Sequence, residues 1–439
     1  MPTPDKIRGG RAGKPFPQCA RRFLTNARLE STLPKTAFKL PPWLSWSPLL
    51  KDPRKPINQL HGHLPLLRLL CLAFAAGRTT LRDVEDFSTD LALSVRKALG
   101  LRGPVSDSTL YRLLAKHSPT GLRESLQDQV RNWLNRGLIT HDRFTLRVVS
   151  IDGKTFFSSQ TRSVDGARVS VAHDVVTSSL MALRAVLSSS LVTPLLDMEF
   201  FGEKEGEASA FRKLFPRLLE ALGACFDMVT ADSGIGCREN AKMVNDAKKG
   251  YLFSLKGIQK LVEDAALALF EQAPGPTLFM SKERRDGGWM IRELHAVPVD
   301  ERSGEAFAGA REFWRVIQRL VVADKVINED ARLFVTNRSV CELGAEEAMG
   351  LVRLHWAIEN NHNWTMDVPM MEDDRQPCQT SKESLEVVCW LRVMGYNIAS
   401  LQRTKATRKD RKPQTWRRTM ERLRDFLCFA SAEIQSVIG

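Results

Sequence analysis

The chain has 439 residues, of which 43% are hydrophobic and 26% are charged, and its formal net charge is +13. This length exceeds one ordinary core, and no apolar run reaches the ~18 residues that a membrane span needs, so we expect two or three domains and no membrane partner. The eight Cys are scattered without a CxxC pair, which argues against a zinc site or a disulfide framework and favours a cytoplasmic protein.

Both ends of the chain are strongly basic. Residues 1–58 hold twelve Lys and Arg against three acidic residues, and residues 402–424 hold ten against two. Aromatic residues are interleaved with these charges, which favours a nucleic-acid partner over two solubilising tails. Residues 1–58 are rich in Pro, Lys and Arg and show no sustained hydrophobic period, so they are predicted to form an extended basic arm.

A helical region is predicted over residues 59–143. Apolar residues recur at helical spacing in four stretches, which are 64–77, the segment after Thr79, the segment after a capping residue at Ser106, and 122–137. Short helices with a basic, recognition-like segment are compatible with a small DNA-binding bundle and equally with a plain docking domain, and both interpretations stay open.

The pattern changes to strands at residues 146–152, a β-branched run closed by Gly153. Strand-like and helix-like runs then follow at about 168–175, 181–190, 193–201, 206–223 (helix), 226–232, 236–248 (helix), 251–256 and 258–270 (helix). Three closely connected strands followed by alternating helices and strands predict a mixed sheet flanked by helices over residues 144–274.

Residues 275–340 interrupt the alternation with strand-like pieces at 289–299, 313–322 and 332–336, and we interpret them as a β-rich insertion. The helical pattern resumes over 341–403, where Leu354–Asn360 contains neither Gly nor Pro. Residues 404–439 are a basic C-terminal tail, for which a flexible segment and a docked helix are equally plausible because the helical phase is poor.

Three acids stand out by their places in this pattern. Asp152 and Asp232 each end an apolar strand and are followed by a Gly within two residues, and Glu359 lies among bulky apolar neighbours. Active-site groups of open sheets gather at strand ends, although a single Asp there is more often a turn or cap residue. A buried carboxylate is costly unless it is paired or binds metal. Three carboxylates suit Mg²⁺ or Mn²⁺, and two such ions support phosphoryl transfer.

Four blocks, in order, resemble a known family. Ile151–Lys154 resembles the first-acid motif of bacterial insertion-sequence transposases of the Asp-Asp-Glu (DDE) type, and Thr230–Gly234 resembles the second-acid strand. Tyr251–Gln259 is similar to the family's hydrophobic strand followed by Leu-Lys-Gly-Asn-Gln, with Ile258 in the Asn place. Arg353–Asn360 is similar to its Arg-x-His-Trp-x-Ile-Glu-Asn helix. The pattern fits the H-repeat-associated group best and covers roughly residues 60–405.

The resemblance implies a ribonuclease-H-like α/β catalytic core, with a mixed five-stranded sheet and flanking helices, a β-rich insertion and an N-terminal helical domain. It implies a transposase that cleaves DNA at the ends of an insertion sequence and joins it to a target. Water would attack the phosphodiester first, and the freed 3′ hydroxyl would then attack target DNA. Asp152, Asp232 and Glu359 would be the catalytic residues and the ligands of two Mg²⁺ or Mn²⁺ ions. The partners would be double-stranded DNA and further copies of the chain, in the bacterial cytoplasm at the nucleoid.

Further residues receive roles from the same resemblance or from their positions. Phosphate or DNA contacts are predicted for Lys154, Lys256, Arg353, His355, Arg403, Arg408, Lys409, Arg411 and Lys412, and accessory roles for Trp356, Asn360, Asp367 and Glu372. The wider family has Tyr, Arg and Lys where this chain has Val352, His355 and Met366, so the source of the phosphate contact after Glu359 is open. Two alternatives remain, a nuclease of the same fold that cuts without joining and a decayed transposase that acts only as a DNA-binding module.

Overall fold

The computed structural model describes residues 50–55, 59–140, 144–202, 205–273, 275–285, 287–372, 374–375 and 381–429. Most of the predicted basic arm (1–58) and the last ten residues of the predicted tail lie outside these ranges. The described elements all fall in one compact unit, Phe38–Ala430. Among the described residues, no helix is both long and apolar enough to cross a membrane. The division of this unit into separate domains stays a prediction.

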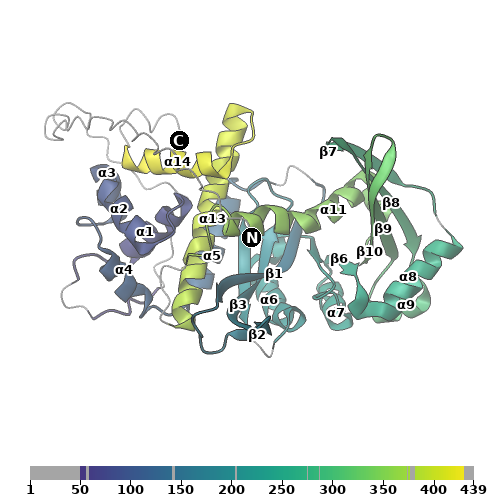
Figure 1. Cartoon of the computed structure of the whole chain (residues 1–439), viewed down its shortest axis with the longest axis horizontal. Coiled ribbons are helices and arrows are strands. Elements are labelled where there is room, and N and C mark those ends of the chain that lie inside the picture. The colour runs from purple at the N-terminus through teal and green to yellow at the C-terminus, as the bar shows by residue number, and fades with distance from the viewer. Residues whose placement is uncertain are drawn as a thin grey trace, which may run out of the picture. The chain divides into compact units, whose positions relative to one another are not determined.

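Five helices precede the sheet in the described residues (Figure 1). Four of them lie where the sequence periodicity predicts helices, and α3 was not predicted. Side-chain caps fix two of their starts. Thr80 and Asp83 form a capping box at the second helix, and the Ser106 side chain accepts from the Thr109 N–H at the fourth. The bounds are α1 (His63–Ala75), α2 (Leu81–Asp90), α3 (Leu93–Leu99), α4 (Asp107–Leu114) and α5 (Leu122–Asn135).

Helix α1 is buried on most of its surface because it packs against the long helix α13 (Lys382–Asp410). The two backbones approach closely at Gly395, where an added Cβ would lie 2.9 Å from the Cys71 carbonyl oxygen. The Cys71 thiol donates to the Leu391 carbonyl oxygen at 3.3 Å. The helical region is therefore anchored to the C-terminal part of the chain.

One mixed sheet organises the rest of the described chain (Figure 1). The strand order is β2-β3-β1-β5-β6-β10-β9-β8-β7, and β4 pairs with β3 beside this path. Strand β3 pairs antiparallel with β1, and β4 pairs antiparallel with β3. Strand β5 is parallel to β1, and β6 is parallel to β5. The bounds are β1 (Val148–Ser159), β2 (Arg168–Ala172), β3 (Val175–Leu187), β4 (Leu195–Phe201), β5 (Met228–Ala231), β6 (Gly250–Leu255), β7 (Phe279–Arg285), β8 (Gly288–Pro298), β9 (Glu312–Val322) and β10 (Lys325–Thr336).

The remaining helices connect or cover these strands. They are α6 (Glu207–Leu222), α7 (Arg238–Asp246), α8 (Lys260–Gln272), α9 (Glu301–Ala306), α10 (Val340–Leu343), α11 (Ala345–Ala357), α12 (Trp364–Asp367) and α14 (Trp416–Cys428), besides α13. A mixed α/β fold with flanking helices is thus confirmed.

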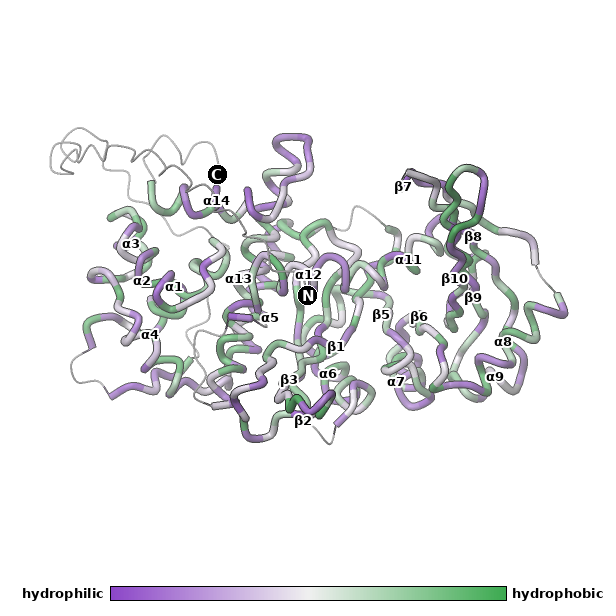
Figure 2. The backbone as a smooth tube through the Cα atoms, viewed as in Figure 1, coloured by the Kyte–Doolittle hydropathy of each residue, from purple (hydrophilic) through white to green (hydrophobic). Residues whose placement is uncertain are grey.

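The β-rich segment differs in detail from the prediction. Its strands β7–β10 continue the same sheet, because β10 pairs antiparallel with β6. Strand β7 and helix α9 were not predicted, and β10 begins at Lys325 rather than near Arg332. Strand β7 and the first half of β10 are largely exposed and carry charged residues, so they lack the apolar alternation that marks a half-buried strand. Figure 2 shows the hydrophilic end of the β7–β8 hairpin beside the largely hydrophobic end of β9–β10, where Val326 and Ile327 are exposed.

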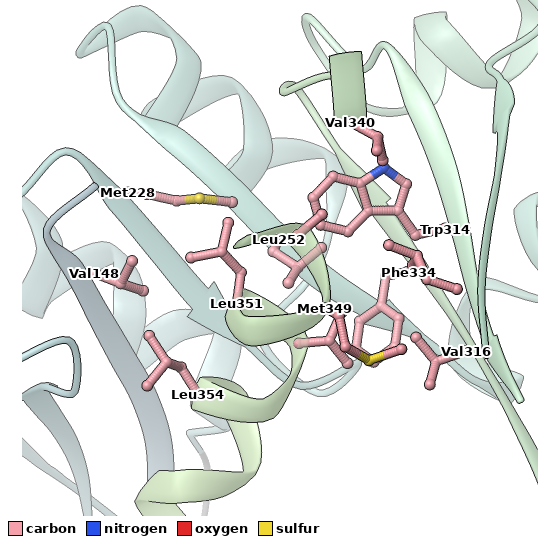
Figure 3. Close-up of a cluster of buried hydrophobic side chains, with 13 residues drawn as sticks. Val148, Met228, Leu252, Trp314, Val316, Phe334, Val340, Met349, Leu351 and Leu354 are labelled. Carbon is pink, nitrogen blue, oxygen red and sulfur yellow. The ribbon is translucent and has the colours of Figure 1, made fainter. Parts of the chain in front are cut away.

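Helix α11 lies across the sheet and joins its two halves in one core (Figure 3). Met349, Leu351 and Leu354 project from it toward the strands. Val148 and Met228 meet them from the central strands, and three further buried side chains do so from β9 and β10, namely Trp314, Val316 and Phe334. Burying a side chain of the size of Leu contributes about 2 kcal/mol. This packing fixes the end of α11, and with it Glu359, relative to both β1 and β7–β10.

The predicted C-terminal tail contains a helix, α14, that packs against α13. Of the two alternatives, a flexible segment and a docked helix, the structure therefore has the docked helix. In α14 the side chains of Trp416, Met420 and Leu427 are buried. The Trp416 ring stacks on Tyr396 of α13 with centroids 5.5 Å apart, and the Arg403 guanidinium lies 4.9 Å from the Trp416 ring centroid. Thr415 caps the helix by accepting from the Arg418 N–H.

Two buried histidines in the helical region predict acid sensitivity. The rings of His63 and His117 stack with centroids 4.9 Å apart, and the His63 side chain is buried. Burial, and then the His117 charge, lower the pKa of His63 to about 4. Between pH 6.5 and pH 4 the unfolded chain binds a proton at His63 that the folded chain does not bind. The folded state is therefore fully stable above the unfolded-state pKa, near 6.5, and loses stability as pH falls toward 4. We expect His63 to account for a loss of up to about 3 kcal/mol of unfolding free energy over this window.

Urea unfolding between pH 7 and pH 4 measures this loss. His63→Phe keeps a ring against His117 and should flatten the pH dependence, whereas His173→Asn, at an exposed turn with φ of 51°, should leave it unchanged. An equally steep pH dependence in His63→Phe contradicts the assignment.

Candidate functional site

Asp152 and Asp232 are neighbours because of strand register. Strands β1 and β5 run parallel, and their pairing ends at Ile151 opposite Ala231. The next residue in each strand is one of the two acids. Strand β1 does not end there, as the sequence suggested, but continues to Ser159 by pairing with β3. Asp152 is therefore held in a continuous strand, which fixes its backbone more firmly than a loop would.

Four carboxylates interact electrostatically where the pairing of β1 with β5 ends. Burial, and then the charges of Asp232, Glu207 and Glu359 in that order, raise the pKa of Asp152 to about 7. Burial also raises the pKa of Asp232, although the backbone N–H groups of Ile235 and Gly234 offset this by donating to its carboxylate. Each shift means that the site holds negative charge poorly in the absence of a cation.

Glu207 is a member of this cluster that the sequence did not reveal. It lies in the first turn of α6, and its carboxylate occupies the space above two glycines. An ideal Cβ on Gly153 would be 1.9 Å from its Oε1, and one on Gly234 would be 2.9 Å from its Oε2. Burial and the Asp232 charge raise the pKa of Glu207. The sequence signals for Glu207 were Gly153 and Gly234, whose missing side chains leave room for its carboxylate. From the sequence alone, both glycines are interpreted only as turn residues.

Glu359 lies in a six-residue π-helix, η5 (Ile358–Asn363), between α11 and α12. Such insertions into α-helices are frequent at functional sites. The expectation that Glu359 is buried is wrong, because its side chain is exposed while Ile358 and His362 carry the buried face. The widened turn explains this difference, since it rotates the helical phase on which the expectation rested.

Asn363, at the end of η5, joins this segment to Asp152. Its Nδ2 donates to Asp152 Oδ2 at 2.8 Å. Its Oδ1 is buried and has no hydrogen-bond partner in the described part of the chain. An orphaned carbonyl-type oxygen beside four carboxylates is a donor set suited to a hard cation, which takes oxygen ligands.

The chain after Glu359 is fixed to the sheet by ion pairs. Arg184 of β3, opposite Asp152 in the register, donates to Glu372 Oε1 at 2.7 Å, and both side chains are almost fully buried. Lys154 of β1 pairs with Asp367 of α12. The accessory acids Asp367 and Glu372 are thus each engaged with a cation of the sheet, and Lys154 is buried rather than displayed to a phosphate.

The loop after Asp232 is clamped from the neighbouring strand. Gln259, just beyond β6, donates from Nε2 to the carbonyl oxygens of Ser233 (2.7 Å) and Gly236. This contact gives the Tyr251–Gln259 block a structural task, which is to hold the turn that carries Asp232. Lys256, in the same block, is exposed.

His355 does not lie where a phosphate contact needs it. The side chain is 7% exposed and packs edge-on against Phe334, with ring centroids 6.4 Å apart. Burial, and then the Arg332 charge, lower the pKa of His355 to about 4, so the ring is neutral. The burial of His355 argues against the predicted phosphate contact, which stays a prediction, and Met366, fully buried in α12, is not exposed to a phosphate either.

The other predicted phosphate contacts and accessory residues lie on several surfaces. Arg353 is half-exposed and lies 3.6 Å from Glu283, and Trp356 faces the Arg332 guanidinium at 4.7 Å. Asn360 is exposed and donates to the Trp356 carbonyl oxygen at 3.0 Å. The basic residues of the tail lie on the end of α13 and the turn after it, where Arg408 donates to Thr140; they are Arg403, Arg408, Lys409, Arg411 and Lys412.

As placed, the described residues contain no group of three or more His, Cys, Asp or Glu side chains set to hold a metal ion. The carboxylates of Asp152, Asp232, Glu207 and Glu359 nevertheless lie near enough to raise the pKa of Asp152. The donor chemistry fits a hard cation, whereas the separation of the side chains is wider than that of a closed site. Both observations agree if the carboxylates draw together when a cation neutralises them.

Comparisons with known proteins point to one class. The H repeat-associated putative transposase YhhI of Escherichia coli K12 is 27% identical over 371 residues, which cover 80% of this chain and 88% of that protein. The putative protein YbfL of the same strain matches with the same identity and coverage. The putative transposase YncI of Escherichia coli O157:H7 is 23% identical and covers 81% of this chain and 86% of its own length. No family model matches the chain.

Among solved structures, a piggyBac transposase synaptic complex with hairpin DNA matches with a TM-score of 0.43 and 10% identity, covering 84% of this chain and 72% of that chain. The resemblance inferred from the four sequence blocks is confirmed by the curated relatives. Over about four fifths of its length, this chain is similar to proteins of the H-repeat-associated group of bacterial insertion-sequence transposases.

Proposed function

We propose that this protein is a DDE-type transposase that cuts DNA at the ends of an insertion sequence and joins the cut ends to target DNA. The observation that carries the proposal is the position of Asp152 and Asp232 directly after the paired ends of β1 and β5, and the charge of Glu359, with those of Asp232 and Glu207, also raises the pKa of Asp152. The names of the curated relatives support a transposase, and the order of the four sequence blocks supports the acid assignments.

The sheet supports a ribonuclease-H-like core. The run β4-β3-β1-β5-β6 has three antiparallel strands followed by two strands parallel to β1, with helices α6 and α7 between β4 and β6. In this interpretation β7–β10 form an insertion that extends the sheet beyond β6 and ends at the helix that carries Glu359.

Asp152, Asp232 and Glu359 would hold the Mg²⁺ or Mn²⁺ ions, with Glu207 beside them. When bound, two such ions supply charge neutralisation at the scissile phosphate and lower the pKa of an attacking hydroxyl or water. The chain's own residues prepare this place. Asn363 orients the Asp152 carboxylate, and the Gly234 and Ile235 N–H groups orient Asp232.

The proposed reaction consists of two nucleophilic substitutions at phosphorus. In cleavage, a water oxygen bonds to phosphorus, the bond to the 3′ oxygen breaks, and a 3′ hydroxyl and a 5′ phosphate result. In joining, that 3′ hydroxyl attacks a target phosphodiester, and a target 3′ oxygen leaves. The substrate is double-stranded DNA, and a homo-oligomer would hold two ends together.

The test is incubation of the purified chain with linear DNA that carries the ends of its own element, in Mn²⁺, followed by mapping of the strands. Cleavage at the element ends together with joined products is the expected result. Cleavage without joining supports the nuclease alternative. Binding without cleavage in either Mg²⁺ or Mn²⁺ supports a decayed transposase that only binds DNA.

The position of Glu207 predicts the effect of a small substitution. Gly153→Ala should reduce cleavage by about 10²-fold, because the added methyl displaces the Glu207 carboxylate and a shift of about 1 Å near the reacting groups has costs of this size. The fold should persist, since the clash falls on the end of a flexible side chain.

Single-turnover cleavage and the melting temperature measure the two effects of Gly153→Ala. Gly103→Ala is the matched control, because nothing lies within 4 Å of the added methyl. Unchanged cleavage in Gly153→Ala removes Glu207 from the site.

A further inference from the structure

A pocket lies beside Glu359, between one face of β7–β10 and the end of α11. Its volume is about 390 Å³. Arg285, Arg292 and Arg332 line it from the strands, and Arg353, Trp356 and Glu359 line it from the helical side. We call this pocket the arginine cleft.

Strand register places its three strand arginines on one face. Alternate residues of a strand point to the same side of a sheet. Arg332 pairs with Val316, which pairs with Leu294, and both apolar side chains belong to the core under α11. Arg292 lies two residues before Leu294 in β8. Arg285 lies an even number of residues from Phe279, the β7 residue that pairs with Leu294. Both arginines therefore point to the same face of the sheet as Arg332. The face that packs on α11 thus continues outward as a row of guanidinium groups.

The cleft wall is rigid on its deeper side. Arg292 is nearly buried, and its guanidinium donates to Glu283 Oε2 at 2.7 Å and to Gln318 Oε1 at 2.9 Å. Glu283 also lies 3.6 Å from Arg353. One carboxylate therefore bridges a strand arginine and a helix arginine, and it fixes the distance between the sheet and the helix that bears Glu359.

Arg332 is exposed, as are Arg285 and Arg353. Its guanidinium lies 4.7 Å from the Trp356 ring centroid, which is a cation–π contact, and its Nε donates to Asp330 Oδ2 at 2.8 Å. Neither Nη atom has a hydrogen-bond partner within the described ranges, and half of the side chain is exposed. A guanidinium that lies over a ring, with its outer N–H groups unpaired, is prepared to receive two oxygens of one phosphate.

We propose that the arginine cleft binds a backbone phosphate of the DNA strand that lies at Glu359, with Arg332 as the principal contact. The inference rests on the proposed function and deepens it. It assigns to a strand of the insertion the phosphate contact that the burial of His355 argues against. The cleft takes a phosphodiester rather than a free anion, because it opens beside the acid that acts on the same strand.

Binding of a fluorescent duplex that carries an element end tests this assignment. Arg332→Gln should weaken binding about tenfold and reduce the slope of log K against log salt by about 0.9, the value for one lost phosphate contact. Arg284→Gln is the matched control. Arg284 lies over another tryptophan of the insertion, Trp289, at 5.6 Å, but on the opposite face of the strands. Arg332→Lys, which keeps the charge but not the paired geometry, should fall between the wild type and Arg332→Gln.

Single neutral methylphosphonates in the duplex locate the phosphate. At one position within two nucleotides of the cleaved bond, the modification should weaken wild-type binding and have no further effect on Arg332→Gln. Equal losses in Arg332→Gln and Arg284→Gln, or a methylphosphonate effect that is the same in wild type and Arg332→Gln at every position, overturn the assignment. Wild-type cleavage in that case leaves the proposed function standing, whereas a wild type that neither binds nor cleaves the ends rejects both.

Discussion

Asp152→Asn should reduce DNA cleavage by about 10³-fold or more, equivalent to about 4 kcal/mol of transition-state stabilisation, and leave DNA binding nearly unchanged. Asp152 lies at the centre of the site, because the charges of Asp232, Glu207 and Glu359 all act on it. Asn is nearly isosteric, so the strand pairing of β1 should persist. The substitution removes one unit of negative charge and one metal-type ligand. Single-turnover cleavage and anisotropy with the same duplex measure the two effects.

Asp174→Asn is the control for this change. Asp174 lies in the exposed turn between β2 and β3 with φ of 63°, a conformation that Asn tolerates. It should cleave as the wild type does. Loss of binding and cleavage together in Asp152→Asn, with an unchanged melting temperature, would assign Asp152 to DNA contact rather than to chemistry. Full cleavage by Asp152→Asn would refute the site.

Arg184→Met should lower the unfolding free energy by about 3–5 kcal/mol, because it leaves the Glu372 carboxylate buried without its cation. Both side chains are at most 1% exposed, so their contact is shielded from bulk solvent. The double variant Arg184→Met with Glu372→Met should recover much of this loss, since neither charge remains. Urea unfolding of the two single variants and of the double variant gives the coupling.

Arg417→Met is the control for the buried pair. Arg417 and Glu421 form an exposed i,i+4 pair in α14, with Arg417 89% exposed. Such pairs contribute about 0.3–0.5 kcal/mol. A loss in Arg184→Met no larger than that of Arg417→Met would show that Glu372 finds another partner or water, and that the segment after Glu359 is held by other contacts.

The elements with strong hydrophobic periodicity could be predicted from the sequence, and so could the proximity of Asp152 and Asp232. Helices α1 and α6 and strands β5 and β6 bury a regular apolar face or run, which is the signal that periodicity reports. Asp152 and Asp232 follow two such strands, and parallel pairing then brings them together without further information.

The remaining features depend on tertiary contacts that local patterns do not encode. Glu207 is an ordinary first-turn acid until its helix is placed over Gly153 and Gly234. The π-helix that exposes Glu359 keeps a helical composition and changes only the hydrogen-bond spacing. Arg332 begins a predicted strand piece, but only the pairing of β10 with its neighbours places it beside Trp356.

The surroundings of Glu359 differ from the related motif in one position that bears on the proposed arginine cleft. A related family has Arg in the place of His355, one turn before the acid. Here the helix position is buried and neutral, and a guanidinium from β10 lies over the neighbouring Trp356. In the proposed cleft, the cation comes from β10 rather than from the helix before Glu359, and no helical motif would reveal it.

Anomalous scattering from Mn²⁺ in crystals of the full chain bound to an element-end duplex tests the central claim most directly. The account predicts Mn²⁺ bound by carboxylate oxygens of Asp152, Asp232 and Glu359 at about 2.1 Å, as hard cations are bound by oxygen, and the loss of this signal in Asp152→Asn. Mn²⁺ bound only elsewhere on the chain, while the same crystals contain cleaved DNA, would contradict it.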